Sequence, residues 1–193
     1  MGAEGLRERS KARRREVIIR RAYELFAERG FEATTIADIA EAAEVSPRTV
    51  TLYFPSKFEL ALEQFEATRE RLAVALRQKD PGVPIVDALE VWLRDELAQR
   101  SDLDALSDRM LELNPQLKAV SNARFCDIVQ EGADLLAEEQ GSSPGSLGPR
   151  MAAAAAAAVI NELCSAHPEE ADIALAMAFL RAGTAVLPSK GGN

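Results

Sequence analysis

Cysteine and histidine are scarce in this chain of 193 residues, and each shortage excludes a class of site. The two cysteines, Cys126 and Cys164, lie in unrelated apolar stretches without a metal-ligand spacing, which argues against a zinc site or a redox motif. We expect both to be buried as small apolar residues. The single histidine, His167, has no partners for a triad or a metal site, so we interpret it as a structural residue at a helix C-terminus.

Long apolar runs are also missing from the sequence. No stretch approaches the ~18 uncharged residues that a membrane span requires, and the basic N-terminus lacks the apolar core of a signal peptide. We therefore expect a cytoplasmic protein that has no membrane partner. A Gly-rich phosphate loop, a Gly-x-Ser-x-Gly elbow and a cluster of metal ligands are absent as well, which argues against an enzyme and predicts no cofactor.

Charge is present in quantity but is unevenly distributed, and the net charge of -8 hides a basic segment. Residues 1–57 carry eleven Lys and Arg against nine Asp and Glu, whereas residues 58–193 carry twelve against twenty-two. Eight of the basic residues lie between Arg7 and Arg21, where the only acidic residues are Glu8 and Glu16. Phosphate binding needs a local basic patch of this kind, although a solvated, frayed terminus is the alternative interpretation.

Hydrophobic residues recur with the helical period in nearly every segment, and no alternating pattern indicates a strand. We predict an all-α fold of about nine helices, with a three-helix N-terminal head and a larger C-terminal helical bundle. The expected division is a head with a basic arm over residues 1–57, a bundle over residues 58–187 and a disordered tail over residues 188–193.

Two short helices in the head have clear start signals. Thr34 or Thr35 is the N-cap of the first, and Ser46 is the N-cap of the second, with Pro47 at its first helical position. The second helix runs to about Tyr53. Two short helices joined by a tight turn form the helix-turn-helix unit that places its second helix in the DNA major groove.

The N-terminal end of that second helix meets the base edges, and here it carries Pro47, Arg48 and Thr49, with Thr51 and Leu52 a step further along. Arg48 is the only long donor at that end, and a bidentate arginine–guanine pair contributes about 1–3 kcal/mol of discrimination. Four further residues at helix ends are candidates for gripping phosphates or serve as caps alone: Thr34, Thr35, Tyr53 and Lys57.

The order of residues over about positions 13 to 62 resembles the TetR family of regulators. The resemblance is carried by Ala22-x-x-Leu-Phe26, Gly30-Phe31, Thr34-Thr35-Ile36, Ile39-Ala40, Val45-Ser46, Thr49 and Tyr53-Phe54-x-x-Lys57. It implies a homodimer that binds a palindromic operator in double-stranded DNA, usually as a repressor released by a ligand in the C-terminal helices. The implied operator contacts are Thr35, Ser46, Arg48, Thr49, Tyr53 and Lys57, with the N-terminal arginines, Arg13 and Arg14 among them, as an arm on the DNA backbone.

Two positions depart from the family pattern. Glu44 stands in the turn where the family often has glycine, so it must adopt a left-handed backbone at a cost of about 1 kcal/mol or the turn must differ. Thr51 stands where an aromatic residue is common, which puts one phosphate or packing contact in doubt.

A two-fold operator requires a two-fold protein, and we expect the last two helices to form the interface. The predicted interface residues are Ala155, Ile173, Met177 and Leu180, in a four-helix bundle across the two-fold axis. The alternative is that both helices only close the core of the monomer. The candidate lining of a pocket for a small apolar or amphipathic ligand is Phe65, Trp92, Met110 and Phe125, each of which could equally be plain core.

A helical scaffold that binds proteins through its acidic body is the alternative to a sequence-specific DNA-binding regulator. The scaffold would have no use for the basic arm or for the ordered motif of the head. Repressor is favoured over activator only by analogy with the family.

Overall fold

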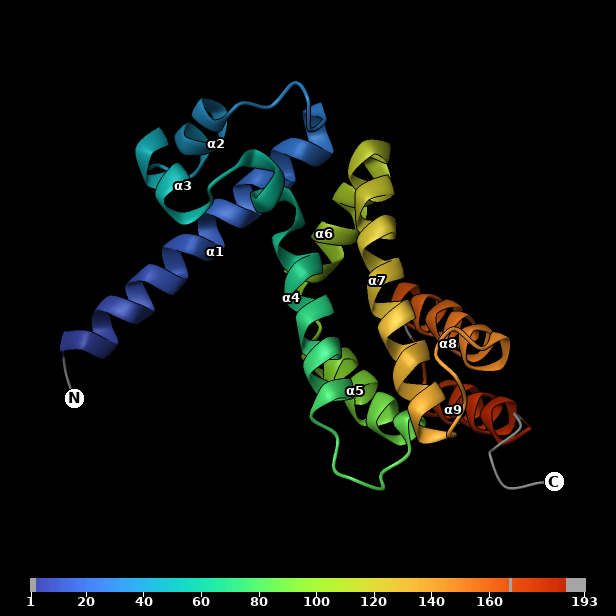
Figure 1. The fold of residues 1–193 in the computed structure, drawn as a ribbon. Coiled ribbons are helices and arrows are strands. Elements are labelled where there is room, and N and C mark those ends of the chain that lie inside the picture. The colour runs from blue at the N-terminus through green and yellow to red at the C-terminus, as the bar shows by residue number, and fades with distance from the viewer. Residues whose placement is uncertain (1–2, 167, 187–193) are drawn as a thin grey trace. The chain divides into compact units, whose positions relative to one another are not determined.

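A computed structural model describes residues 3–166 and 168–186, and over this part of the chain the fold consists of nine α-helices without a strand. The helices are α1 (Ala3–Arg29), α2 (Ile36–Ala42), α3 (Pro47–Tyr53), α4 (Lys57–Arg77), α5 (Ile85–Gln99), α6 (Asp102–Leu113), α7 (Pro115–Glu139), α8 (Leu147–Ser165) and α9 (Glu170–Ala185) (Figure 1). The predicted all-α class is confirmed. None of the described helices is long and apolar enough to cross a membrane. His167 and the tail from 188 to 193 lie outside the described residues.

The helix boundaries follow the local start and stop signals. Gly30 ends α1 with a φ of 87°, a left-handed conformation that glycine adopts without steric cost. Ser56 accepts a hydrogen bond from the Glu59 amide at 3.0 Å and so caps the first turn of α4. Ser101 and Asp104 form a capping box at the start of α6, where each side chain meets the other residue's backbone.

The chain divides into two compact units. The first contains the chain up to Ala67 together with Arg100–Asn122, and the second contains Thr68–Gln99 together with the chain from Ala123. This differs from a single cut after residue 57, because α6 packs along α1 in the first unit. Helices α4 and α7 each begin in the first unit and end in the second.

The core of the first unit forms around the apolar face of α1. Ile18, Ala22 and Phe26 are fully buried there, and Val50 of α3 and Met110 of α6 join the same cluster. The short helices α2 and α3 lie next to each other, and α2 also contacts α1 (Figure 1). Burial of α1 therefore holds the two-helix unit in place.

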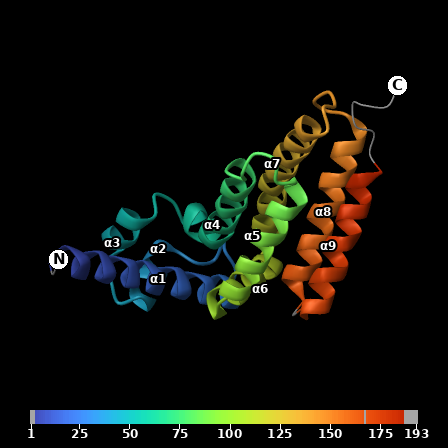
Figure 2. The same ribbon diagram turned by 90° about the horizontal axis from the view of Figure 1, so that it is seen from below.

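The core of the second unit brings together apolar side chains of α4, α5, α7, α8 and α9. Leu93 and Met177 are fully buried in it, and Trp92 is nearly so. Helices α8 and α9 run side by side along their length (Figure 2). Cys126, in contrast, is exposed on α7, because the inward face of that helix is carried by residues such as Ile128; the prediction that it is buried is wrong.

An ion-pair network joins α9 to α5 at the surface of the second unit. Arg181 donates to Asp87 at 2.8 Å and to Glu90, while Arg94 donates to Glu90 at 2.9 Å and to Glu170 at 2.5 Å. Hydrogen bonds from Arg181 and then Arg94 hold the pKa of Glu90 below its ordinary value.

Candidate functional site

The turn between α2 and α3 contains one strained backbone position. Glu44 has a φ of 54°, and among the described residues it is the one non-glycine residue with positive φ. Its side chain is exposed, so the left-handed backbone is required by the path of the turn and not by packing of the side chain. The Val45 amide donates to the Ala40 carbonyl at 2.9 Å, which closes the turn and sets the direction of α3. Of the two expected alternatives, the chain adopts the left-handed one.

The start of α3 is organised by Ser46 and Pro47. Ser46 is the N-cap: its hydroxyl accepts a hydrogen bond from the Thr49 amide at 3.1 Å and lies 2.8 Å from the Thr49 hydroxyl. Pro47 occupies the first helical position, where its missing N–H leaves no bond unmade. These contacts fix the end of the helix that would meet base edges.

The outer face of α3 combines a cation with an apolar group. Val50 is fully buried beneath the helix, and Arg48 on the opposite face is exposed. Leu52 is 82% exposed and lies one turn after Arg48 on the same helix. A guanidinium reads guanine, and an aliphatic side chain packs on a thymine methyl group.

The N-terminal part of α1 supplies the basic arm as a helix. Arg13 and Arg14 are both exposed on it. Arg15, by comparison, is engaged internally: its guanidinium lies 2.5 Å from the Glu63 carboxylate and 4.9 Å from the centre of the Phe54 ring. Arg13 and Arg14 therefore stay candidates for phosphate contacts, whereas Arg15 fastens α1 to α4 and to the end of α3.

Thr34 and Lys57 point into the first unit. Thr34 is 1% exposed, and its hydroxyl donates to the Gly30 carbonyl at 2.9 Å. The Lys57 ammonium donates to the carbonyls of Phe31 at 2.7 Å and Thr34 at 2.9 Å, and it lies 4.2 Å from the centre of the Phe31 ring. Both side chains hold the loop between α1 and α2. The Lys57 ammonium has a third N–H beyond the two used here, so the phosphate contact expected of Lys57 stays a prediction.

Thr35 and Tyr53 lie at the ends of the two-helix unit. Thr35 is exposed, but its hydroxyl donates to Asp38 at 2.6 Å and accepts from the Asp38 amide at 3.2 Å. The hydrogen bond from the Thr35 hydroxyl, and then the one from the Thr35 amide to the Asp38 carboxylate at 2.7 Å, hold the pKa of Asp38 below its ordinary value. Tyr53 is half-buried, with its ring centre 6.4 Å from that of Phe54. Capping thus accounts for Thr35 in this structure.

Asn114 is a positioning residue that the sequence did not reveal. It is 2% exposed and accepts a hydrogen bond from the Phe31 amide at 2.7 Å, while it donates to the carbonyls of Phe26 at 2.9 Å and Met110 at 2.8 Å. The junction of α6 and α7 is thereby joined to the end of α1, next to the loop that Lys57 holds. Two of these partners, Phe31 and Phe26, are more than 80 positions away along the chain, beyond the reach of local sequence patterns.

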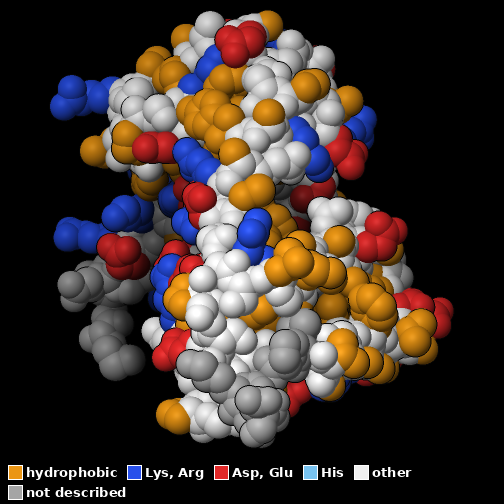
Figure 3. Space-filling view, turned by 45° about the vertical axis from the view of Figure 1, so that its right-hand side comes forward, with side chains coloured by type: hydrophobic (Ala, Val, Ile, Leu, Met, Phe, Trp, Pro, Cys, Tyr) orange, Lys and Arg blue, Asp and Glu red, His pale blue; other side chains and the backbone are white. Residues whose placement is uncertain are grey.

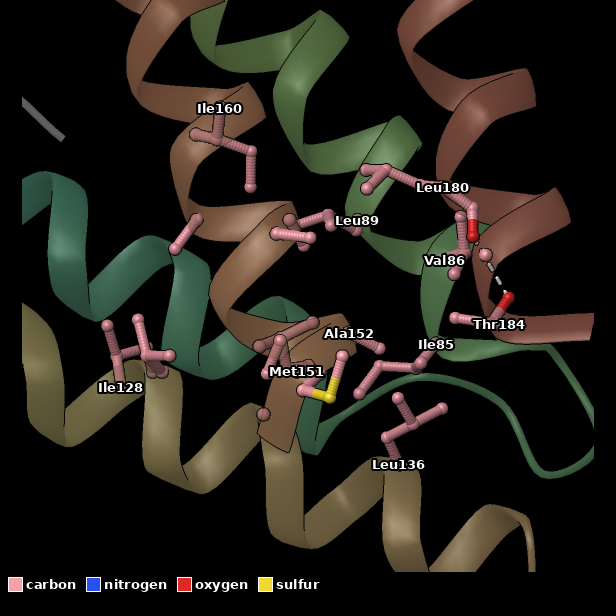
Figure 4. Close-up of a pocket in the computed structure, with 18 of the residues that line it drawn as sticks. Ile85, Val86, Leu89, Ile128, Leu136, Met151, Ala152, Ile160, Leu180 and Thr184 are labelled. Atoms are coloured by element: carbon pink, nitrogen blue, oxygen red, sulfur yellow. Dashed lines mark hydrogen bonds between the residues drawn. The ribbon is translucent and has the colours of Figure 1, made fainter. Parts of the chain in front are cut away.

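The second unit contains a cavity of about 290 Å³ (Figure 4). Of the four predicted ligand-binding residues, only Phe125 lines it. Trp92 packs in the core of the second unit, and Met110 is fully buried in the first unit, to which Phe65 also belongs. The sequence could not separate cavity from core, because both present apolar residues at the same helical spacing.

Within the single chain, Ile173, Met177 and Leu180 are buried against neighbouring helices, and Ala155 lines the cavity. Their assignment to a dimer interface stays a prediction. The large apolar side chains that α8 and α9 expose are Leu147, Met151, Leu175 and Phe179, with Val186 directly after α9.

Comparison with known proteins identifies the two-helix unit. Residues 18–63 match the family described as "Bacterial regulatory proteins, tetR family". The HTH-type transcriptional regulator TcmR of Streptomyces glaucescens is 34% identical over 146 residues, which cover 71% of this chain and 65% of TcmR. The chain belongs to the TetR family of transcriptional regulators. The family match includes the whole of α2 and α3, in agreement with the resemblance found in the sequence.

Solved structures show the same fold as this TetR-family chain. GusR of Salmonella enterica has a TM-score of 0.65 at 22% identity, over 89% of this chain and 95% of that one. NalD of Pseudomonas aeruginosa, described as the secondary repressor of the MexAB-OprM multidrug efflux pump, has a TM-score of 0.61 at 22% identity, over 94% of this chain and 100% of that one. At 22% identity, the similarity to these two proteins shows a shared fold and no more.

Proposed function

We propose that this TetR-family chain is a repressor that binds a palindromic operator as a homodimer and is released by a small molecule. The observation that carries the proposal is the outer face of α3, where Arg48 and Leu52 are exposed at the end of the helix-turn-helix that the family match covers. A helix of this kind fits the major groove, and its exposed side chains read base edges.

The exposed arginines of α1 support a DNA-binding role for a chain whose total charge is negative. Arg13 and Arg14 would contact phosphates and add affinity that does not depend on sequence. Replacing either by alanine should weaken binding equally on all DNA sequences. It should also reduce the slope of the logarithm of the binding constant against the logarithm of the salt concentration by about one.

A homodimer is supported by the exposed apolar face of α8 and α9. Figure 3 shows hydrophobic side chains exposed in the lower right of that view, and Phe179 is 59% exposed. Sedimentation of Phe179→Glu tests this part of the proposal, with Val91→Glu as the control, because Val91 is comparably exposed on α5. Loss of the dimer in the first variant alone would support the proposed interface, and a dimer that survives in both would contradict it.

The DNA-binding proposal is tested by footprinting the purified protein on its own upstream DNA at two salt concentrations. Arg48→Ala should weaken protection of the operator by roughly tenfold to a hundredfold, the value of an arginine–guanine pair. Arg150→Ala is the matched control, since it removes the same charge from an exposed position on α8. Equal protection by the parent, Arg48→Ala and Arg150→Ala would contradict base reading by Arg48. A parent protein that does not bind DNA even at low salt would instead favour the protein-binding scaffold.

A further inference from the structure

We infer that the cavity of the second unit takes an uncharged, largely apolar molecule about the size of two or three fused rings. The inference rests on the proposed function, because it names the chemical class of the ligand for that regulator. It follows from the walls of the cavity, its volume and the one polar group that it presents.

The wall of the cavity contains no charged side chain among the described residues that line it. Helices α4, α5, α7, α8 and α9 contribute aliphatic, phenyl, thioether, alanine and glycine surfaces, and the labelled side chains of Figure 4 surround one space. A carboxylate, ammonium or guanidinium in this space would lose its hydration without gaining a counter-charge. An ionised ligand is therefore disfavoured whatever the sign of its charge.

The space exists because one wall is built of small residues. Ala152 of α8 lies opposite larger side chains such as Ile85 and Leu136 (Figure 4), and Ala156 of the same helix also lines the cavity. Gly183 of α9 also lines the cavity, and a Cβ added there would meet nothing within 4 Å. A well-packed core would have closed such a gap, since protein interiors have few voids larger than a water molecule.

The volume sets the size of the ligand. An engineered apolar cavity of about 150 Å³ stays dry and binds benzene. The cavity here, at about 290 Å³, is nearly twice as large and is also apolar, but it opens to the surface, where the exposed Met151, Phe179 and Val186 form part of its lining. A fused bicyclic or tricyclic frame matches this volume and would displace little ordered water, because the wall offers few hydrogen-bond partners.

Among the described residues that line the cavity, Thr184 provides the single polar side chain. Its hydroxyl donates within α9, to the carbonyl of Leu180 at 3.1 Å or of Arg181 at 3.0 Å, as Figure 4 shows for Leu180. With its proton engaged, the oxygen keeps a lone pair that can accept a hydrogen bond. A ligand with one hydroxyl group on an apolar frame therefore fits this wall better than a pure hydrocarbon.

Three probes that share one frame test the charge rule by titration calorimetry on the full chain without DNA. They are 2-naphthalenemethanol, which is neutral, 2-naphthoate and 2-naphthylmethylammonium. The neutral probe should bind at least tenfold more tightly than either ion. Equal or tighter binding of an ion, or no binding of the neutral probe, would overturn the inference.

Two variants place the binding in the cavity. Ala156→Leu adds three carbon atoms to the lining and should weaken the neutral probe at least tenfold. Ala154→Leu makes the same change on α8 at an exposed position outside the lining and should leave affinity unchanged. A neutral probe that binds Ala156→Leu as well as the parent would overturn the assignment to this cavity. Thermal unfolding of both variants shows whether each is folded.

A separate assay distinguishes failure of this inference from failure of the proposed function. Operator binding is measured with and without saturating 2-naphthalenemethanol. If the probe binds with the expected selectivity but leaves the DNA complex intact, the chemical class stands and release by this molecule fails. If operator binding is normal and the neutral probe is not preferred, the regulator stands and the chemical class is wrong.

Discussion

Replacement of Asn114 by alanine tests how the first unit is held together. The side chain is buried at the junction of α6 and α7 and makes three hydrogen bonds, to the Phe31 amide and to the carbonyls of Phe26 and Met110. Alanine removes all three without adding bulk. The Phe26 carbonyl still accepts from the Gly30 amide at 3.1 Å, but the Phe31 amide loses its partner in a buried position.

The expected loss follows from these contacts. A typical intramolecular hydrogen bond contributes about 1 kcal/mol net, and a buried donor left without a partner costs about 1–3 kcal/mol. Three bonds, one of which leaves such a donor, therefore predict a decrease of about 3 kcal/mol in the free energy of unfolding. For a chain of this length that corresponds to a decrease in Tm of roughly 10 °C.

Urea and thermal unfolding of Asn114→Ala measure this loss. Asn122→Ala is the matched control, because Asn122 lies on the same helix, α7, with an exposed side chain. The control should change the free energy of unfolding by less than about 0.5 kcal/mol. If Asn114→Ala were no more destabilising than Asn122→Ala, the three hydrogen bonds would not hold the end of α1, and the reasoning would be refuted.

Three further predictions follow from single features of the structure. Glu44→Gly relieves the left-handed backbone and should raise the free energy of unfolding, measured in urea, by about 0.5–1 kcal/mol, whereas the control Glu41→Gly, inside α2, should lower it by about 1 kcal/mol. A gain in both variants or a loss in both would contradict the strain argument. Lys57→Met removes two hydrogen bonds to the loop after α1 and should lower the free energy of unfolding by about 2 kcal/mol, but it should not change how steeply operator binding falls with salt concentration. A log–log slope reduced by about one would show instead that Lys57 contacts a phosphate. The pKa of Glu90 lies lower in the folded chain than in the unfolded chain, so its ion pairs stabilise the fold fully above about pH 4.5 and are lost as pH falls through the folded pKa. Glu90→Gln should therefore make the free energy of unfolding depend less on pH in that acid range, and an unchanged pH profile would show that this ion-pair network does not cause the dependence.

Local signals explain why most helices could be placed from the sequence. Ser46 and Pro47 mark the start of α3, and Gly30 marks the end of α1, because caps and backbone preferences act over one helical turn. The left-handed Glu44 was one of the two alternatives that the sequence left open, because the family often has glycine at this position.

Roles that depend on distant partners were not predictable in this way. Lys57 and Thr34 are residue types that often bind phosphates, but in the folded chain both donate hydrogen bonds to carbonyls of the loop after α1. Ile173 and Met177 form an apolar stripe that fits a dimer interface as well as a monomer core, and only the tertiary structure shows that both are buried in the second unit of the single chain.

The sequence by itself determined the helical class, the helix-turn-helix and the basic segment before it, because periodicity, caps and charge runs are read within a few residues of one another. Only the tertiary structure decided which polar groups remain available to a partner and where apolar surface encloses a space. Those outcomes depend on which helices meet: Asn114 finds Phe31 across 83 positions, and the alanines of α8 line a cavity only because larger side chains stand opposite them.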